Sequence, residues 1–255
     1  MKLAILLASA ACALAQDPFE IHVYEYETLH PWQFTLEQHL NYWAIGARQF
    51  DGPLAPTNDQ LHMTYELTAG ITDQFSIGFM QLNAVLPGVG FQYAGWRVLP
   101  HFYAPESWHL PVKLGLVAEF SFARPQYIAD TAHVEIRPIV EKKVGDWQVD
   151  FNPVFGRALR GAGVSDGWEF EPAARIAHGD EDRKLRPYLE WYSELGSLPE
   201  FLPVRTEVHQ IYPGVDWKLA ENLLWSVGIG VGLTPQQPRL VIKSRIEFEF
   251  GRRSP

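Results

Sequence analysis

The sequence predicts an all-β protein: an up-and-down antiparallel transmembrane β-barrel of about twelve strands, placed after an N-terminal signal peptide. Three observations predict this fold class. Apolar and polar residues alternate with a period of two, segment after segment, from Trp32 to the end of the chain. The segments run about eleven to fourteen residues, which is long enough for a tilted strand to cross a bilayer. Tight turns and longer loops alternate between them, as in bacterial outer-membrane barrels.

Residues 1–15 have the features of a secretory signal peptide. Lys2 precedes an apolar run, and Ala13 and Ala15 stand at the spacing that signal peptidase reads, so cleavage is expected after residue 15. Cys12 is the only cysteine and leaves with the signal peptide. The mature chain then has no disulfide, no cysteine metal ligand and no cysteine nucleophile.

The composition excludes several other classes of protein. No apolar run of the mature chain approaches the 18 or more residues that a membrane helix requires. The formal net charge is -9 and no basic stripe is present, so we expect no nucleic-acid partner. Aromatic residues cluster near segment ends, where girdles at the lipid–water boundary would hold them. The tryptophans concerned are Trp43, Trp147, Trp168, Trp191, Trp217 and Trp225.

Residues 32–255 form the expected barrel domain, and residues 16–31 precede it. The twelve strands are expected at 33–46, 60–71, 74–84, 90–103, 109–122, 131–143, 147–158, 168–178, 184–195, 206–219, 223–234 and 239–250. Residues 17–30 also alternate. Three placements are open for them: a periplasmic extension, a strand laid in the lumen, or a thirteenth wall strand. Bacterial barrels have even strand numbers, which favours the periplasmic extension.

One face of these strands is too apolar to be left in water. If each strand presents about five large apolar side chains, their burial is worth on the order of 100 kcal/mol at roughly 1.5 to 3 kcal/mol each. That face must therefore meet either a protein core, as in a secreted β-sandwich or soluble barrel, or lipid. Strand length, alternating connections, the signal peptide and the aromatic residues at strand ends favour lipid. We take the apolar face as outward.

The opposite face then lines the lumen, with charges of both signs. The predicted lumen-lining residues are Glu37, His39, His62, Glu66, Arg97, His101, Lys113, Glu119, Glu135, Arg137, Glu141, Asp150, Glu169, Glu171, Arg175, Arg186, Glu190, Asp216, Lys218, Lys243, Arg245 and Glu247. Because unpaired charges in a confined interior are costly, we expect these side chains to pair and to fill much of a narrow lumen. Acidic residues outnumber basic ones in this set, so any conducting path should weakly prefer cations.

Seven prolines fall inside successive segments, although proline lacks the donor that a strand ladder requires. They are Pro100, Pro111, Pro138, Pro153, Pro172, Pro187 and Pro213. We interpret them as a belt of bulges or bends that adds curvature to the wall.

No motif for catalysis or for a cofactor is present. The sequence contains no H-E-x-x-H, no G-x-S-x-G elbow and no phosphate-binding glycine loop. Its nine histidines form no pair at a metal-ligand spacing. We therefore predict no catalytic residues, no metal site and no cofactor. A Ser, a His and a carboxylate brought together from separate strands would escape this inspection, because triads are recognised by geometry.

Several stretches resemble one family of outer-membrane proteins. "LTAGITDQFSIGFMQ", "LRPYLEWY", "YPGVDWKLAENLLWSVGIGVGL" and the closing "RIEFEF" resemble a family described by the MetA pathway of phenol degradation, or as transporter-like. The resemblance implies an outer-membrane barrel concerned with uptake or efflux of small, including aromatic, compounds. It supplies no catalytic residues.

The sequence thus predicts a monomer in the bacterial outer membrane, with both termini periplasmic. Its expected partners are outer-membrane lipid, small solutes and the barrel-insertion machinery, which would read the amphipathic C-terminal strand. The favoured function is a narrow channel or transporter for small solutes, not an enzyme. Two alternatives stay open: a structural or partner-binding barrel without transport, and a barrel hydrolase.

Overall fold

The structure is a computed structural model that describes residues 17–234 and 240–251. The expected signal peptide lies outside these residues. Within them, the only helical elements are two 3₁₀ turns, η1 (Glu106–Trp108) and η2 (Ala162–Ser165), and no helix is long and apolar enough to cross a membrane. The strands are β1 (Gln33–Ile45), β2 (Gln60–Thr72), β3 (Phe75–Leu86), β4 (Gly90–Tyr103), β5 (Lys113–Ala123), β6 (Ala132–Val144), β7 (Trp147–Asn152), β8 (Phe155–Arg160), β9 (Trp168–Phe170), β10 (Ala173–His178), β11 (Leu185–Glu194), β12 (Gly196–Ser197), β13 (Glu200–Phe201), β14 (Val208–Ala220), β15 (Leu223–Gly232) and β16 (Leu240–Gly251).

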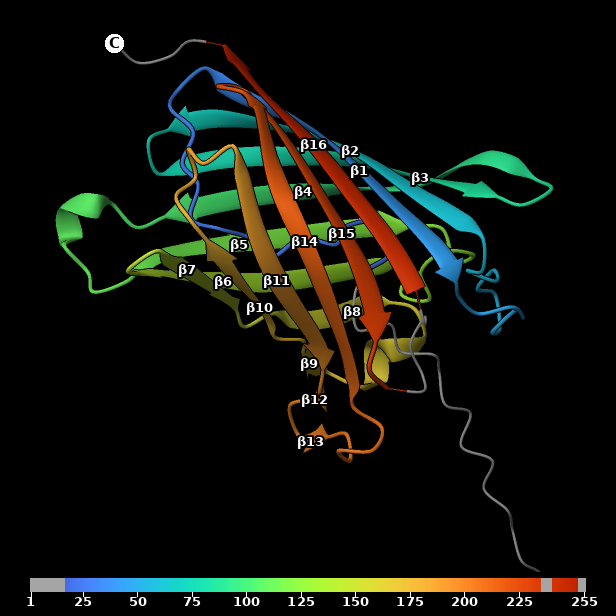
Figure 1. Ribbon diagram of the computed structural model, residues 1–255. Helices are drawn as coiled ribbons and strands as arrows, with labels where there is room; N and C mark the ends of the chain where they lie inside the picture. Colours follow the sequence, from blue (N-terminus) through green and yellow to red (C-terminus); the bar gives the residue numbers. More distant parts are fainter. Residues whose placement is uncertain (1–16, 235–239, 252–255) are drawn as a thin grey trace, which may run out of the picture.

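The strands form one closed antiparallel barrel with twelve positions in its wall (Figure 1). β7 and β8 are two halves of one wall strand, because both pair with β6. β9 and β10 occupy the next position, and β12 and β13 form a small hairpin in the connection from β11 to β14. Pairing of β1 with β16 and of β6 with β7 closes the ring. The predicted fold class, an up-and-down barrel of about twelve strands, is confirmed.

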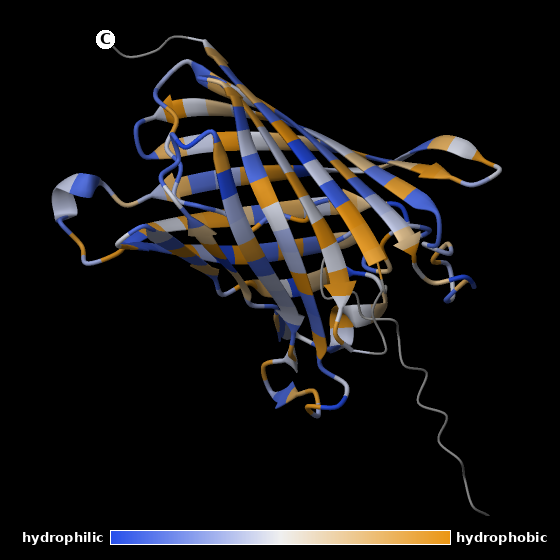
Figure 2. Ribbon diagram, viewed as in Figure 1, coloured by the Kyte–Doolittle hydropathy of each residue, from blue (hydrophilic) through white to orange (hydrophobic). Residues whose placement is uncertain are grey.

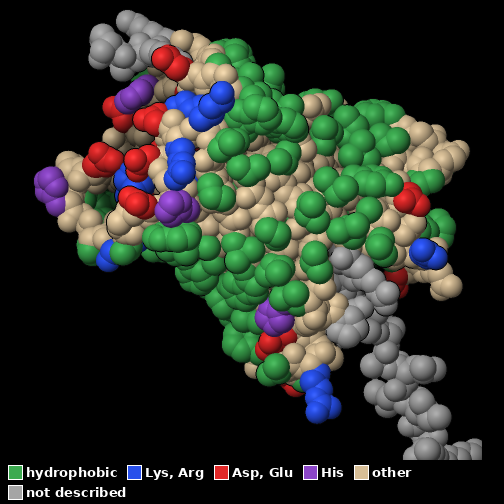
Figure 3. Space-filling view, viewed as in Figure 1, with side chains coloured by type: hydrophobic (Ala, Val, Ile, Leu, Met, Phe, Trp, Pro, Cys, Tyr) green, Lys and Arg blue, Asp and Glu red, His purple; other side chains and the backbone are tan. Residues whose placement is uncertain are grey.

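The apolar face of the wall points outward, as the sequence predicts. Leu67 in β2, Phe79 in β3 and Ile229 in β15 are 47%, 51% and 52% exposed, whereas their neighbours Glu66 and Met80 are buried. Figure 2 shows this alternation along the strands, and Figure 3 shows hydrophobic side chains over the outer wall with charged side chains gathered at its ends. An exposed apolar belt of this kind faces lipid.

The two ends of the barrel differ in their connections. The turns at 73–74, 145–146 and 221–222 are tight and lie at the end where β1 begins and β16 finishes, since Gln33 is opposite Gly251. Longer connections, such as 46–59, 124–131 and 195–207, lie at the other end. The end with the tight turns is called the turn end below.

The prolines do not form the expected belt of bulges, and that interpretation is wrong. Pro153 and Pro172 lie in the breaks between β7 and β8 and between β9 and β10. Pro213 stays within β14 and is opposite Leu189 of β11. On its other side, β14 pairs with β15 before and after Pro213 in the same register, but not at Pro213 itself. Because proline lacks an N–H, the ladder is lost on one side only. A register shift occurs elsewhere, for example at Leu82 in β3.

The remaining prolines behave in a similar way. Pro100, Pro138 and Pro187 stay within β4, β6 and β11, and Pro111 precedes β5.

One tryptophan does not belong to a girdle at the lipid boundary. Trp43 is 2% exposed and lies inside the barrel, where its ring meets that of His62 at 5.7 Å between centroids. The reason is parity, because Trp43 shares the inward face of β1 with His39. By contrast, Trp217 and Trp225 stack on each other near the turn end, on the outward face.

Candidate functional site: a charged lumen occupied by residues 17–30

Residues 17–30 lie in the lumen and not outside the barrel. Phe19 and Val23 are fully buried and Glu20 is 1% exposed, and the blue trace that precedes β1 runs inside the wall (Figure 1). The segment passes from the middle of the lumen to the turn end, where His30 Nδ1 lies 2.9 Å from Asp73 Oδ1. The structure therefore shows a segment laid in the lumen, which is the second of the three placements that the sequence left open. It does not show the periplasmic extension that even strand number favours. Even strand number counts only the wall and does not decide what fills it.

Side chains of the wall satisfy the backbone of this segment. Tyr24 N–H donates to Asn152 Oδ1 at 2.7 Å, and Asn152 Nδ2 donates back to the Tyr24 carbonyl at 3.0 Å. Thr64 Oγ1 donates to the Phe19 carbonyl at 2.8 Å. A buried extended segment that is not part of a sheet needs such partners, because unpaired backbone groups are costly.

Apolar side chains of the segment pack against apolar parts of the inner wall. Phe19 and Tyr24 belong to a buried cluster that includes Met80, Leu82, Leu99, Val117 and Ile139. Ile21 and Val23 pack in a second cluster with Trp43, Tyr192, Tyr212 and Val241. Each fully buried side chain of this size contributes about 1.5 to 3 kcal/mol, so the segment is an integral part of the folded barrel.

Two arginines of the wall bind the carboxylates at the start of the segment. The buried guanidinium of Arg97 in β4 contacts Asp17 and lies 3.3 Å from Glu20 Oε2. Arg137 in β6 lies 3.7 Å from Glu20 Oε1 and 2.7 Å from Glu135 Oε2. The segment contains four carboxylates and no Lys or Arg, so its charge complements these side chains.

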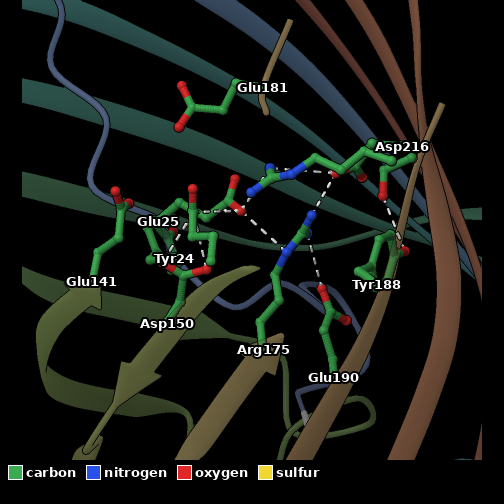
Figure 4. A network of polar contacts seen from close by, with 12 residues as sticks. Tyr24, Glu25, Glu141, Asp150, Arg175, Glu181, Tyr188, Glu190 and Asp216 are labelled. Atoms are coloured by element: carbon green, nitrogen blue, oxygen red, sulfur yellow. Dashed lines mark hydrogen bonds and ion pairs between the residues drawn. The ribbon is translucent and has the colours of Figure 1, made fainter. Parts of the chain in front are cut away.

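A second pair of arginines binds Glu25 nearer the turn end (Figure 4). Glu25 Oε1 lies 3.1 Å from Arg175 Nε and 3.2 Å from Arg186 Nη1. Arg175 also contacts Glu190, at 3.6 Å, and Asp216. Arg175 therefore connects β10, β11 and β14 to the segment inside them.

The structure places most of the predicted lumen-lining residues inside the barrel. Buried there are Glu37, His39, His62, Glu66, Arg97, His101, Glu119, Glu135, Arg137, Glu141, Asp150, Arg175, Arg186, Glu190, Asp216, Lys243, Arg245 and Glu247. Glu169, Glu171, Lys113 and Lys218 are half-buried. Lys113 lies 3.5 Å from Glu106 and 3.9 Å from Glu141. Lys218 donates a hydrogen bond to Asp182, which lowers the pKa of that carboxyl, in the turn between β10 and β11.

Three cavities follow the segment through the lumen. The first, about 250 Å³, lies at the turn end and is lined by Glu25, Glu27 and a rim of charged side chains. The second, about 30 Å³, shares Glu25 and Glu27 with the first. The third, also about 30 Å³, shares His22 with the second and extends to Glu135. The two inner cavities have room for about one water molecule each, so the interior is narrow.

Glycines on the inner face make room for large side chains. A side chain at Gly230 would collide with the ring of Tyr212, and one at Gly228 would meet Lys243 Cε at 3.1 Å. Tyr212 is 1% exposed. Small residues in β15 thus allow the lumen to be filled from β14 and β16.

Sequence inspection missed one arrangement near the end of the barrel that carries the longer connections. Ser193 Oγ lies 2.9 Å from His209 Nδ1, and His209 Nε2 lies 3.3 Å from Glu207 Oε2. Ser193 and His209 are opposite each other on β11 and β14, and Ser193 is 1% exposed. No motif brings these residues together, since the register of two strands does so.

The predicted set of lumen-lining residues also lacks the carboxylates of residues 17–30. Their signal is present in the sequence: Asp17, Glu20, Glu25 and Glu27 form an acidic alternating segment without a basic residue, ahead of a wall whose arginines lie on the inward face. Charge complementarity could have placed the segment inside where strand parity could not.

Comparison with known proteins supports the fold. A scan against protein-family models and a search of curated proteins found no match. Among solved structures, the chain is similar to the COG4313 outer membrane channel from Pseudomonas putida F1, with 12% identity and a TM-score of 0.60 over 91% of this chain and 100% of that one. It is also similar to KdgM porin, with 10% identity and a TM-score of 0.53 over 85% of this chain and 99% of that one.

At such low identities the similarity shows the fold alone. The chain is an outer-membrane β-barrel. Its apolar outer belt, its closed antiparallel wall and its porin-like neighbours place it in the bacterial outer membrane.

Proposed function

We propose that the protein is an outer-membrane channel that passes small solutes along a narrow path beside residues 17–30. The observation that carries this proposal is the row of three cavities, which follows the segment and shares lining residues from one cavity to the next. A wall without such a path would support only a structural barrel. Two of the similar solved structures are a porin and a channel, which agrees with the proposal.

The path is lined mainly by carboxylates, so we propose that it prefers cations. Eleven of the predicted lumen-lining residues are acidic and eight are Lys or Arg, and residues 17–30 add four carboxylates. Charged rings of one sign select ions of the opposite sign in narrow pores. We therefore propose that cations pass more readily than anions.

The resemblance to the family of the MetA pathway of phenol degradation leads us to propose small aromatic compounds as solutes, which pass the two inner cavities of about 30 Å³ only when residues 17–30 move aside. The aromatic side chains of the segment, Tyr24 and Tyr26, line the cavities and offer ring faces for stacking. Block of the ion current by a small aromatic compound added from one side would support this solute class. An unchanged current at saturating concentration would count against it.

Planar-bilayer recording tests the channel directly. Purified protein, shown to be folded by heat-modifiable migration, is expected to give stepwise single-channel currents of low conductance. Folded protein that gives no steps would favour the structural or partner-binding barrel, because folding alone does not produce conductance.

One observation favours the hydrolase as a second candidate. In the contacts of Ser193, His209 and Glu207, the hydroxyl could attack an acyl carbonyl, the imidazole could take its proton and the carboxylate could orient the ring. Because Ser193 is 1% exposed, an acyl substrate reaches it only if the surrounding side chains move. Ester hydrolysis by the folded barrel that disappears in Ser193→Ala and persists in Ser197→Ala would support the enzyme, whereas no labelling of Ser193 by a fluorophosphonate would exclude it.

A further inference from the structure

Glu66 is a buried carboxylate without a basic side chain beside it. Its Oε1 accepts a hydrogen bond from Thr68 Oγ1 at 2.8 Å. Within the part of the chain that the structure describes, the only cationic group within 4.0 Å of Glu66 is the ring of His39. An uncompensated carboxylate away from water is costly. A cation bound beside Glu66 would compensate its charge.

His39 presents a nitrogen to Glu66 and to a second carboxylate. The His39 residue is 1% exposed, and its Nε2 has no hydrogen-bond partner. Nε2 lies 3.3 Å from Glu37 Oε2 and 4.0 Å from Glu66 Oε2. A metal ion can bind a buried imidazole nitrogen that faces two carboxylates in this way.

The spacing of the three donors fits one ion. One ligand atom from each of Glu37, His39 and Glu66 lies within 4.8 Å of the other two. Ligands at about 2.0 to 2.2 Å from a tetrahedral Zn²⁺ are about 3.3 to 3.6 Å apart. Separations of up to 4.8 Å would have to shorten by about 1.2 to 1.5 Å for all three donors to reach the ion.

We propose that Glu37, His39 and Glu66 bind one divalent transition-metal ion in the lumen, at the inner faces of β1 and β2. One imidazole and two carboxylates form a ligand set that suits Zn²⁺. The ion would compensate Glu66. It would also lie toward residues 17–30, since the His22 ring is 6.2 Å from that of His39.

The inner cavity of about 30 Å³ supplies a fourth position. Glu37 and Glu66 line it together with His101, whose Nε2 is buried and has no hydrogen-bond partner. The cavity has room for one water molecule. A water in this cavity would therefore complete the coordination without a new opening in the wall.

Arg245 does not prevent binding. Its Nη1 lies 2.9 Å from Glu37 Oε2 and 2.9 Å from Glu247 Oε2, and a carboxylate has about four acceptor sites, so Arg245 and an ion can share Glu37. Glu27, Glu247 and Glu249 offer oxygens within 4.8 Å of one another nearby. With more carboxylates than basic groups, the region gains from a dipositive ion.

The experiment titrates Zn²⁺ into the full mature barrel, stripped with a chelator and held in detergent, against a chromophoric zinc indicator. We expect one Zn²⁺ to bind per barrel. In His39→Ala and in Glu66→Gln, the affinity for Zn²⁺ should fall by about 100-fold or more. His133→Ala is the matched control, because His133 is another interior histidine, 3.7 Å from Glu135 Oε1, and it should bind as the unmodified protein does.

X-ray absorption of the zinc-loaded unmodified barrel keeps the proposal testable if a variant fails to fold. We expect one imidazole nitrogen, with oxygens completing the shell. Absence of stoichiometric binding, binding that survives both His39→Ala and Glu66→Gln, or a spectrum without imidazole would overturn the proposal. None of these readouts needs conductance, so the result is independent of the proposed channel.

Discussion

Replacement of Glu25 by Gln should release residues 17–30 from the lumen wall. Glu25 Oε1 lies within 3.2 Å of Arg175 and Arg186, and both arginine side chains are at most 5% exposed. A Gln side chain keeps the shape and one acceptor but removes the charge that both guanidinium groups face. Hydrogen bonds to charged groups are worth about 1 to 2 kcal/mol more than neutral ones.

The expected loss is therefore about 2 kcal/mol in the free energy that holds the segment in place. Since 1.4 kcal/mol is a factor of ten in an equilibrium constant, the population of barrels with a detached segment should rise about 30-fold. In single-channel recordings this appears as longer or more frequent openings of larger conductance. Arg175 keeps Glu190 and Asp216 as partners, so the barrel itself should stay folded.

A second readout follows the segment directly. Cys12, the only cysteine of the chain, lies in the expected signal peptide, so Ile21→Cys introduces a single thiol into the expected mature chain, at a position that is 3% exposed. Its labelling by a membrane-impermeant reagent should be slow, and should accelerate about 30-fold when Glu25→Gln is added.

Glu181→Gln is the matched control for this prediction. Glu181 lies 2.8 Å from Lys143 Nζ at the turn end, and both side chains are exposed, so the same chemical change should leave the segment in place. If Glu25→Gln changes neither the openings nor the labelling, or if Glu181→Gln changes them equally, the ion pairs of Glu25 do not hold the segment.

Three further predictions concern the wall and the path. Phe79→Arg, on the lipid face of β3, should destabilise the barrel in liposomes by about 2 to 4 kcal/mol, whereas Phe50→Arg in the β1–β2 loop should change the free energy of unfolding by less than about 1 kcal/mol; equal effects would contradict the outward orientation. Gly230→Ala should lower the free energy of unfolding by about 1 to 3 kcal/mol, because the new methyl group displaces the ring of Tyr212. Gly228→Ala should lower it less, because the flexible side chain of Lys243 can move away; denaturant titration of both variants tests this order. The reversal potential in a salt gradient should show a weak preference for cations, and anion preference would refute the proposed lining.

The alternation of residues by itself determined the wall of this protein. In β5, Leu116 and Phe120 point outward and Glu119 points inward, because a strand has a period of two and only lipid accepts so many exposed apolar side chains. The strand number and the inward residues follow from the same local pattern. These are properties that each segment carries in its own sequence.

Only the tertiary structure decided what occupies the lumen and which inward side chains meet. Tyr24 binds Asn152, 128 positions away, and Glu66 meets His39 through the register of β1 and β2. Ser193 and His209 meet in the same way. Such contacts depend on barrel closure and on the filling of a confined volume, which act between distant residues and leave no local period in the chain. For that reason, the sequence of residues 17–30 has the pattern of one more alternating strand, and only the folded barrel shows that this segment occupies the lumen.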